Sequence, residues 1–297
     1  MQALYSFFQH EKGDVRLFEK ELFKSLDKIY DLYLSVLALL LDIHHVSLVI
    51  MDENKNKRLP SKEDITPNMK FANNSLLISM GKNKELKDLL EKKKINWQSD
   101  FDLVRRIFNE IKAGETYQSY LKSSETSIDL ERDLIISIIT EHLSENDVLT
   151  SLFEEKNIHW ADDTFVAFNS VIRNLEEFDG EFKLQPLLKD EKDDLEFMSS
   201  LFNKTIIYHQ QFEELIGRHT KNWEVERIAN MDMLLMEMAL AEILYIPNVP
   251  VKASLNEYID ISKEYSTPNS KTFVNGVLDN ILKDLTKEDR VRKVDRK

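Results

Sequence analysis

Two neighbouring histidines, His44 and His45, are the side chains that most directly suggest a metal site. Adjacent side chains on a helix point about 100° apart, so this pair cannot easily chelate one ion. No further metal-ligating side chain follows four residues later, where a zinc site on a helix would need one. We therefore interpret the pair as the end of a core helix and predict no metal ion.

Patterns that accompany catalysis or nucleotide binding do not occur in this sequence. The six glycines never cluster, so no glycine-rich loop can cradle a phosphate. The chain has no cysteine nucleophile, no H-E-x-x-H motif and no G-x-S-x-G motif. The acidic run DEKDD at 190–194 lacks the alternating ligands of a calcium loop and fits the solvated start of a helix. These observations predict a binding protein that is not an enzyme and needs no cofactor.

Composition indicates an all-α protein. The 297 residues contain 42% hydrophobic side chains but only six glycines and six prolines, which leaves little room for the tight turns of a sheet. The absence of cysteine fits a reducing cytoplasm. No signal peptide is recognisable, and the apolar run at 34–43 is too short to span a bilayer. We therefore expect a cytoplasmic protein without a membrane partner.

The acidic charge balance argues against strong diffuse attraction of the chain to a nucleic acid. The formal net charge is −13, of which residues 1–195 carry −11 and residues 196–297 carry −2. Diffuse attraction to phosphate should therefore be weak, although a locally basic edge could still hold RNA.

The first third of the chain contains two helix patterns and one expected loop. The segment 1–10 has helical spacing of apolar residues but no N-cap, so it reads as a helix whose start is missing. A longer apolar stripe predicts a helix over 17–46. The polar stretch 52–68 has no periodicity and two prolines, and we expect a loop there.

Three tryptophans, Trp97, Trp160 and Trp223, lie 63 residues apart. Each follows a pair of apolar residues by seven and eight positions and precedes a new apolar-periodic run. This order predicts three units, each a helix, a turn that contains the tryptophan, and a second helix, as in stacked helical arrays. Two such pairs would occupy about 68–178, with the three tryptophans in equivalent turns. Unrelated helices with coincidental spacing are the alternative.

The most informative stretch follows Pro247 and Pro250, which end one helix. Apolar residues recur with helical spacing over 255–262, and after a break at 266–270 a second apolar stripe covers 273–285. Gly276 lies inside the second stripe, where glycine costs about 1 kcal/mol relative to alanine. We expect it to mark a close approach of another backbone or of a ligand.

These helices carry a resemblance to a known family. The segments VKASLNEYIDISKEY (251–265) and NSKTFVNGVLDNIL (269–282) resemble the C-terminal signature of the NusB transcription antitermination family. The helix ERIANMDMLLMEMALAEIL (226–244) and the first residues, MQALYSFFQ, are similar to further family segments. The resemblance implies a NusB-like helical bundle interrupted by an inserted array of helical pairs. We expect N-terminal core helices at 1–46, the insertion at 47–189, C-terminal core helices at 190–286 and a charged tail at 287–297.

The resemblance also implies a function in transcription antitermination. Members of the family bind the single-stranded boxA segment of ribosomal RNA leaders, together with the small-subunit ribosomal protein NusE, in the transcription elongation complex. By position in the matching segments, the expected partner-binding residue is Asp232, whose alternative role is an exposed helix charge. The expected RNA-binding residues are Gln2, Tyr5, Lys252, Lys271 and Phe273; for Tyr5 and Phe273 the alternative is core packing.

Three departures from the family pattern weaken the RNA prediction. Glu237 stands where the family has an arginine, Thr272 stands where it has a lysine, and the arginine-rich segment before Gln2 is absent from this sequence. For that segment, either the true start lies upstream of Met1 or the protein binds RNA with less charge. The alternative function is therefore a NusB-like scaffold that binds proteins and has lost RNA binding.

Overall fold

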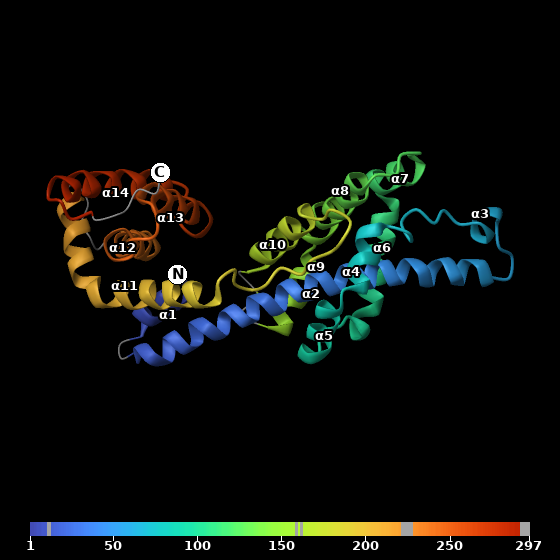
Figure 1. Cartoon of the computed structure of the whole chain (residues 1–297), viewed down its shortest axis with the longest axis horizontal. Helices are drawn as coiled ribbons and strands as arrows, with labels where there is room; N and C mark the ends of the chain where they lie inside the picture. Colours follow the sequence, from blue (N-terminus) through green and yellow to red (C-terminus); the bar gives the residue numbers. More distant parts are fainter. Residues whose placement is uncertain (11–12, 158–159, 161–162, 221–227, 292–297) are drawn as a thin grey trace. The chain divides into compact units, whose positions relative to one another are not determined.

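The computed structural model describes residues 1–10, 13–157, 160, 163–220 and 228–291. Every regular element in these ranges is a helix, which confirms the predicted all-α class (Figure 1). The α-helices are α1 (Gln2–Gln9), α2 (Val15–Asn56), α3 (Lys62–Ile65), α4 (Ser75–Lys82), α5 (Lys84–Lys93), α6 (Phe101–Ala113), α7 (Glu115–Lys122), α8 (Ile128–Ile138), α9 (Asp147–Lys156), α10 (Thr164–Glu176), α11 (Glu191–His219), α12 (Asn230–Tyr245), α13 (Val251–Tyr265) and α14 (Ser270–Lys287). A 3₁₀ turn, η1 (Gln98–Asp100), and a π turn, η2 (Ile139–Leu143), complete them.

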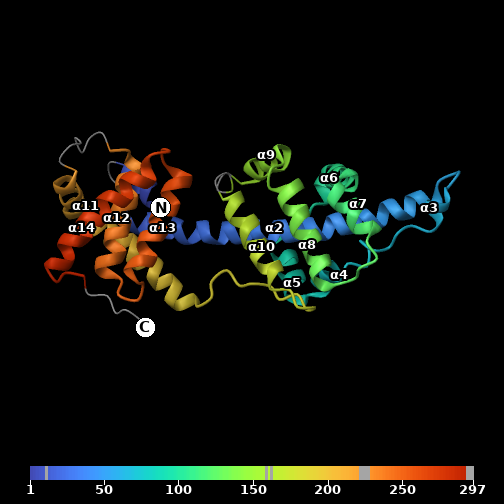
Figure 2. The same cartoon turned by 90° about the horizontal axis from the view of Figure 1, so that it is seen from above.

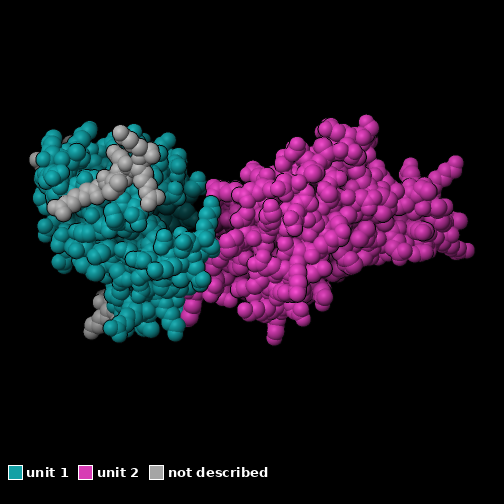
Figure 3. Space-filling view, viewed as in Figure 1, with its two compact units in different colours: residues 1–23, 188–297 teal, residues 24–187 magenta. Residues whose placement is uncertain are grey.

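The chain divides into two compact units, each with its own hydrophobic core (Figure 3). Unit 1 comprises Met1–Phe23 and Leu188–Lys297, and unit 2 comprises Lys24–Leu187. The boundary between Leu187 and Leu188 lies within two residues of the expected boundary at 189–190. The expected boundary at 46–47 falls inside α2, because this helix continues without a break from Val15 to Asn56.

Helix α2 is longer than the sequence pattern predicted. Its apolar stripe ends near Val46, but the helix runs ten residues further, so the loop expected over 52–68 is wrong for its first part. The extension is supported by a two-point contact between the Arg105 guanidinium on α6 and the Glu53 carboxylate, with one N–O distance of 2.9 Å. By length and composition α2 could cross a membrane, but 61% of its most apolar stretch is buried inside the protein, as expected for a core helix.

Unit 2 contains two helical pairs in the predicted register. The pair α5–α6 and the pair α9–α10 begin and end 63 residues apart, at 84–93 and 147–156 and at 101–113 and 164–176. Their first helices share the same cap, because the side chains of Asn83 and Asn146 accept the backbone N–H of Leu86 and Leu149 at 2.8 and 3.0 Å. The two pairs are therefore structural repeats.

The tryptophans explain why the repeats stack at this spacing along α2 (Figure 2). The indole N–H of Trp97 donates to the carbonyl of Ser35 at 3.0 Å, and that of Trp160 donates to the carbonyl of Lys28 at 2.7 Å. The two acceptor carbonyls are seven residues apart on α2, which corresponds to about 10.5 Å along the helix axis. This rise is close to the 8–10 Å that separates the axes of packed helices, so neighbouring repeats can each reach one carbonyl. The prediction of equivalent turns is thus confirmed for Trp97 and Trp160, whereas Trp223 lies outside the described residues.

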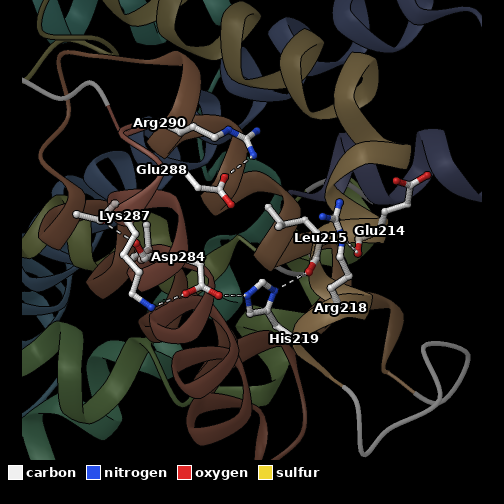
Figure 4. Close-up of polar contacts among 10 residues, drawn as sticks. Glu214, Leu215, Arg218, His219, Asp284, Lys287, Glu288 and Arg290 are labelled. Atoms are coloured by element: carbon white, nitrogen blue, oxygen red, sulfur yellow. Dashed lines mark hydrogen bonds and ion pairs between the residues drawn. The ribbon is translucent and has the colours of Figure 1, made fainter.

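Unit 1 is built around α12, which is surrounded by α11, α13 and α14 and contacts α1 (Figure 1). Eleven of its sixteen residues are buried, so α12 is a core helix without a polar face. The end of α11 is fastened to α14 by Asp284, whose carboxylate contacts His219 at 3.2 Å and Lys287 at 2.9 Å (Figure 4). The Lys287 and His219 contacts lower the pKa of Asp284.

We expect Trp97→Phe and Trp160→Phe each to lower the free energy of unfolding of the protein by about 1–3 kcal/mol. Each change removes the N–H that anchors one repeat to α2 and leaves a small void beside it. Urea unfolding followed by circular dichroism measures the effect, with Phe165→Leu at an exposed site as the control. Variants as stable as the wild type would show that the indole contacts do not hold the repeats on α2.

Candidate nucleic-acid and partner interface

The carboxylate of Asp232 is buried at the break between α13 and α14. Its side chain lies in the first turn of α12 and is 5% exposed. One oxygen accepts the hydroxyl of Ser266 at 2.6 Å and the other accepts that of Ser270 at 2.8 Å. The interpretation as an exposed helix charge is therefore wrong, because Asp232 fixes the residues from which α14 starts.

The first turn of α14 lies between two hollows that share Thr272. A groove of about 450 Å³ runs between α13 and α14, and Lys271 lines it. A second hollow of about 630 Å³ lies beside the start of α12, and Phe273 lines it with Asp232. Lys271 and Phe273 are thus neighbours that serve different hollows.

The groove between α13 and α14 is locally basic. Lys263, Lys271 and Asp260 line it, so its lining carries a net charge of +1, and Lys263 forms an ion pair with Asp260 on its own helix. Lys252 is exposed one turn before Asn256, a lining residue, and on the same face of α13. The first turn of α14 adds the positive end of the helix dipole, and it contains no acidic residue. These features suit a phosphate group.

Gln2 and Tyr5 lie on the outer face of α1. Leu4 is buried on the inner face, where it joins the core of unit 1, whereas Gln2 is exposed and Tyr5 is 38% exposed. The chief helix contact of α1 is with α12, while α14 contacts α11, α12 and α13. The structure therefore brings Lys271, Phe273 and Asp232 together and places the α1 residues on another helix of the same unit.

Phe273 has features of both roles considered for it, packing in the core and contact with a ligand at the surface. Its ring is half-buried and packs against the core of unit 1, yet it also lines the hollow beside Asp232. Tyr5 is different, because it is exposed and is not a core residue of unit 1.

Gly276 does not mark the approach of another backbone. It is exposed on α14, and a Cβ atom built there would meet no atom within 4 Å. The expectation of a close backbone is therefore wrong, and the glycine leaves an open stretch of helix surface next to Asn275, which lines the basic groove.

Glu237 does not place a negative charge on the protein surface. It is 1% exposed, and one carboxylate oxygen contacts Nδ1 of His209 on α11 at 2.9 Å. The other oxygen has no hydrogen-bond partner among the described residues. Burial raises the pKa of Glu237, and donation of the His209 N–H to the Glu237 carboxylate raises the pKa of His209. The residue that departs from the family arginine is therefore a buried carboxylate that contacts α11 and is not a surface charge.

A third buried carboxylate on α12, Glu242, was not anticipated from the sequence. It is 5% exposed and accepts the hydroxyl of Tyr258 on α13 at 2.8 Å. The only signal for such contacts is the occurrence of acidic residues at 232, 237 and 242 in a helix that is otherwise apolar. A charged residue in such a helix must be paired or hydrogen-bonded.

Comparison with known proteins identifies the region that contains this interface. The sequence model of the NusB family matches residues 164–283, from the first residue of α10 into α14. The chain is 46% identical over 101 residues to the transcription antitermination protein NusB of Salinibacter ruber and 35% identical over 102 residues to that of Bacillus subtilis. It is 45% identical over 84 residues to that of Chloroherpeton thalassium. No solved structure matches the chain.

The similarity covers only part of each protein. It spans 34%, 34% and 28% of this chain for the Salinibacter, Bacillus and Chloroherpeton proteins. It spans 63%, 77% and 40% of those proteins themselves, so two of the three are matched over less than two thirds of their length.

The contact between His209 and Glu237 predicts a pH-dependent stability. Because the pKa of His209 is raised above its ordinary value of 6.5, the contact stabilises the protein fully below that pH. The stabilisation disappears as the pH rises through the folded-state pKa, and the raised pKa of Glu237 acts in the same direction. At about pH 6 we expect His209→Gln to lower the free energy of unfolding by about 1–3 kcal/mol.

Urea unfolding at several pH values between about 6 and 9 measures this dependence. The difference between wild type and His209→Gln should shrink as the pH rises. His10→Gln, at an exposed histidine, is the control. A difference that is constant with pH would contradict a charged contact.

Proposed function

The chain belongs to the NusB family of transcription antitermination proteins, and we propose that it binds a boxA-like single-stranded leader RNA together with the NusE-type ribosomal protein. In this proposal the complex acts within the transcription elongation complex during synthesis of ribosomal RNA, in the cytoplasm. The protein contributes binding surfaces and no catalysis.

The observation that supports RNA binding best is the basic groove between α13 and α14. In a chain of net charge −13, this groove gathers Lys263 and Lys271 against a single acid, Asp260, with Lys252 one turn away, at the positive end of α14. Cations and helix N-terminal N–H groups together bind the phosphates of a single strand. The acidic balance of the rest of the chain keeps the attraction local.

Aromatic side chains supply the second element of single-strand binding. Phe273 lines the adjoining hollow, and Tyr5 is exposed on α1. Bases that leave the phosphates in the groove can stack on such rings, and Gln2, on the same face of α1 as Tyr5, can donate to a base edge. Thr272, which lines both hollows, replaces the lysine of the family pattern, so Lys271 carries the main charge at this point.

The hollow beside Asp232 is the proposed contact for the ribosomal protein. It measures about 630 Å³, and beyond the Phe273 ring assigned to RNA its lining combines apolar Ile228 and Ala229 with the buried Asp232 carboxylate. A side chain of a basic partner can insert there and approach the carboxylate, and the negative charge of Asp232 favours such a partner.

The experiment is binding of the full chain, mixed with the ribosomal partner, to a boxA-like strand and to a scrambled strand of equal composition. Phe273→Ala should weaken binding by about 1–3 kcal/mol with little dependence on salt, because it removes a stacked base. Lys271→Ala should weaken binding less and should reduce the salt slope by about 0.7, the value for one contact to a single-strand phosphate.

Lys283→Ala is the matched control, because this lysine is exposed on α14 three turns further along and lines neither hollow. It should leave both affinity and salt slope unchanged. Equal affinity for the boxA-like and the scrambled strand would refute the RNA proposal and favour the protein-binding scaffold.

A further inference from the structure

Unit 2 has a groove between its two helical repeats. The residues that line it lie between positions 100 and 155, outside the region 164–283 that matches the NusB family. Helix α6 ends the first repeat and α9 begins the second, and both lie on one side of α2 (Figure 2). Between them is a groove of about 530 Å³. Grooves between stacked helical repeats are common binding surfaces for protein partners.

The floor of this groove is apolar. Leu103 of α6 and Leu152 of α9 are half-buried against the core of unit 2. Val148, one turn before Leu152 on α9, is 48% exposed and extends the apolar strip toward solvent. A strip of this kind matches the apolar face of a helix from a partner.

The rim of the groove is negatively charged. Asp102 and Glu155 are exposed on opposite helices, and neither forms an ion pair with another described residue. Asp100 is neutralised by Lys156 at 2.7 Å. The one cation in the lining, Arg106, is 3.8 Å from Glu110. Glu155 is therefore available to a basic ligand, and so is Asp102, which interacts electrostatically with Arg105 one turn along α6 but forms no ion pair with it.

The sequence around the second repeat strengthens this field. Residues 141–181 contain eleven acidic side chains and two basic ones, whereas the first repeat, residues 84–113, contains six acidic and eight basic ones, so the negative field comes from the second repeat and from the rim carboxylates. Such a surface repels nucleic-acid phosphates and attracts cationic protein segments over several ångströms. The charge thus selects a protein over an RNA as the occupant of this groove.

We propose that the groove between α6 and α9 binds a basic amphipathic helix of a partner protein. Apolar side chains of that helix cover Leu103, Val148 and Leu152, and its lysines or arginines pair with Asp102 and Glu155. This surface is separate from the RNA and ribosomal-protein contacts proposed for unit 1, so the inserted repeats add a second protein partner.

The test uses the full chain and a fluorescently labelled amphipathic peptide of leucine and lysine, with binding followed by anisotropy. Glu155→Lys should weaken binding about fivefold to tenfold at low salt, because it replaces an attraction by a repulsion at the rim. Val148→Ser should weaken binding about threefold to fivefold, because it removes part of the apolar strip.

Each variant has a matched control. Glu154→Lys makes the same charge change on the neighbouring exposed residue of α9, which does not line the groove. Val166→Ser changes a valine of similar exposure, 40%, on α10. Both controls should change the affinity by less than twofold, and circular dichroism of all four variants should match the wild type.

Equal weakening by Glu155→Lys and Glu154→Lys would overturn the proposal, because it would indicate diffuse attraction to an acidic surface. The proposal would also be overturned if a peptide in which every lysine is replaced by glutamate bound as tightly as the lysine peptide. Competition of oligouridylate with the lysine peptide, relieved by the groove variants, would assign the groove to a nucleic acid instead.

Discussion

The hydrogen bonds of Asp232 to Ser266 and Ser270 are the constraint on which the candidate interface depends. Burying a carboxylate is costly unless hydrogen bonds compensate, and here both oxygens of Asp232 accept hydroxyls from the segment in which α13 ends and α14 begins beside α12. The same principle repeats along α12, where Glu237 meets His209 of α11 and Glu242 meets Tyr258 of α13. Each acid thereby joins the core helix to a different part of unit 1, and the start of α14 is oriented as a result.

Unit 2 is built differently, because two similar helical pairs stack on one long helix, α2. The indole N–H groups of Trp97 and Trp160 bond to α2 carbonyls seven residues apart, a distance that matches the separation of packed helices. Stacking by repetition buries the inner faces of the repeats and leaves the groove between α6 and α9 at the surface. The residues that line this groove lie outside the region 164–283 that matches the NusB family.

Features that depend on local pattern were predictable from the sequence. The stripe over 273–285 predicts α14, and the tryptophan spacing predicts the repeat, because periodicity reports which face of a helix is buried. The end of α2 was missed, because residues near Glu53 are solvated on most sides and their support from Arg105 is 52 residues distant. The roles of Asp232 and Glu237 were also hidden, since their partners lie 28 to 38 residues away and pairing inside a core is a tertiary property.

Hydrogen–deuterium exchange at 266–276, in wild type and in Asp232→Ala, tests this account most directly. Removing the carboxylate takes away the acceptor on α12 and leaves only the local contacts among Ser266, Thr267 and Ser270, so the first turn of α14 should open more often and exchange faster. Amides of α2 in unit 2 should exchange as in the wild type. Unchanged exchange over 266–276 in a folded Asp232→Ala protein would contradict the claim that this buried carboxylate holds the interface in place.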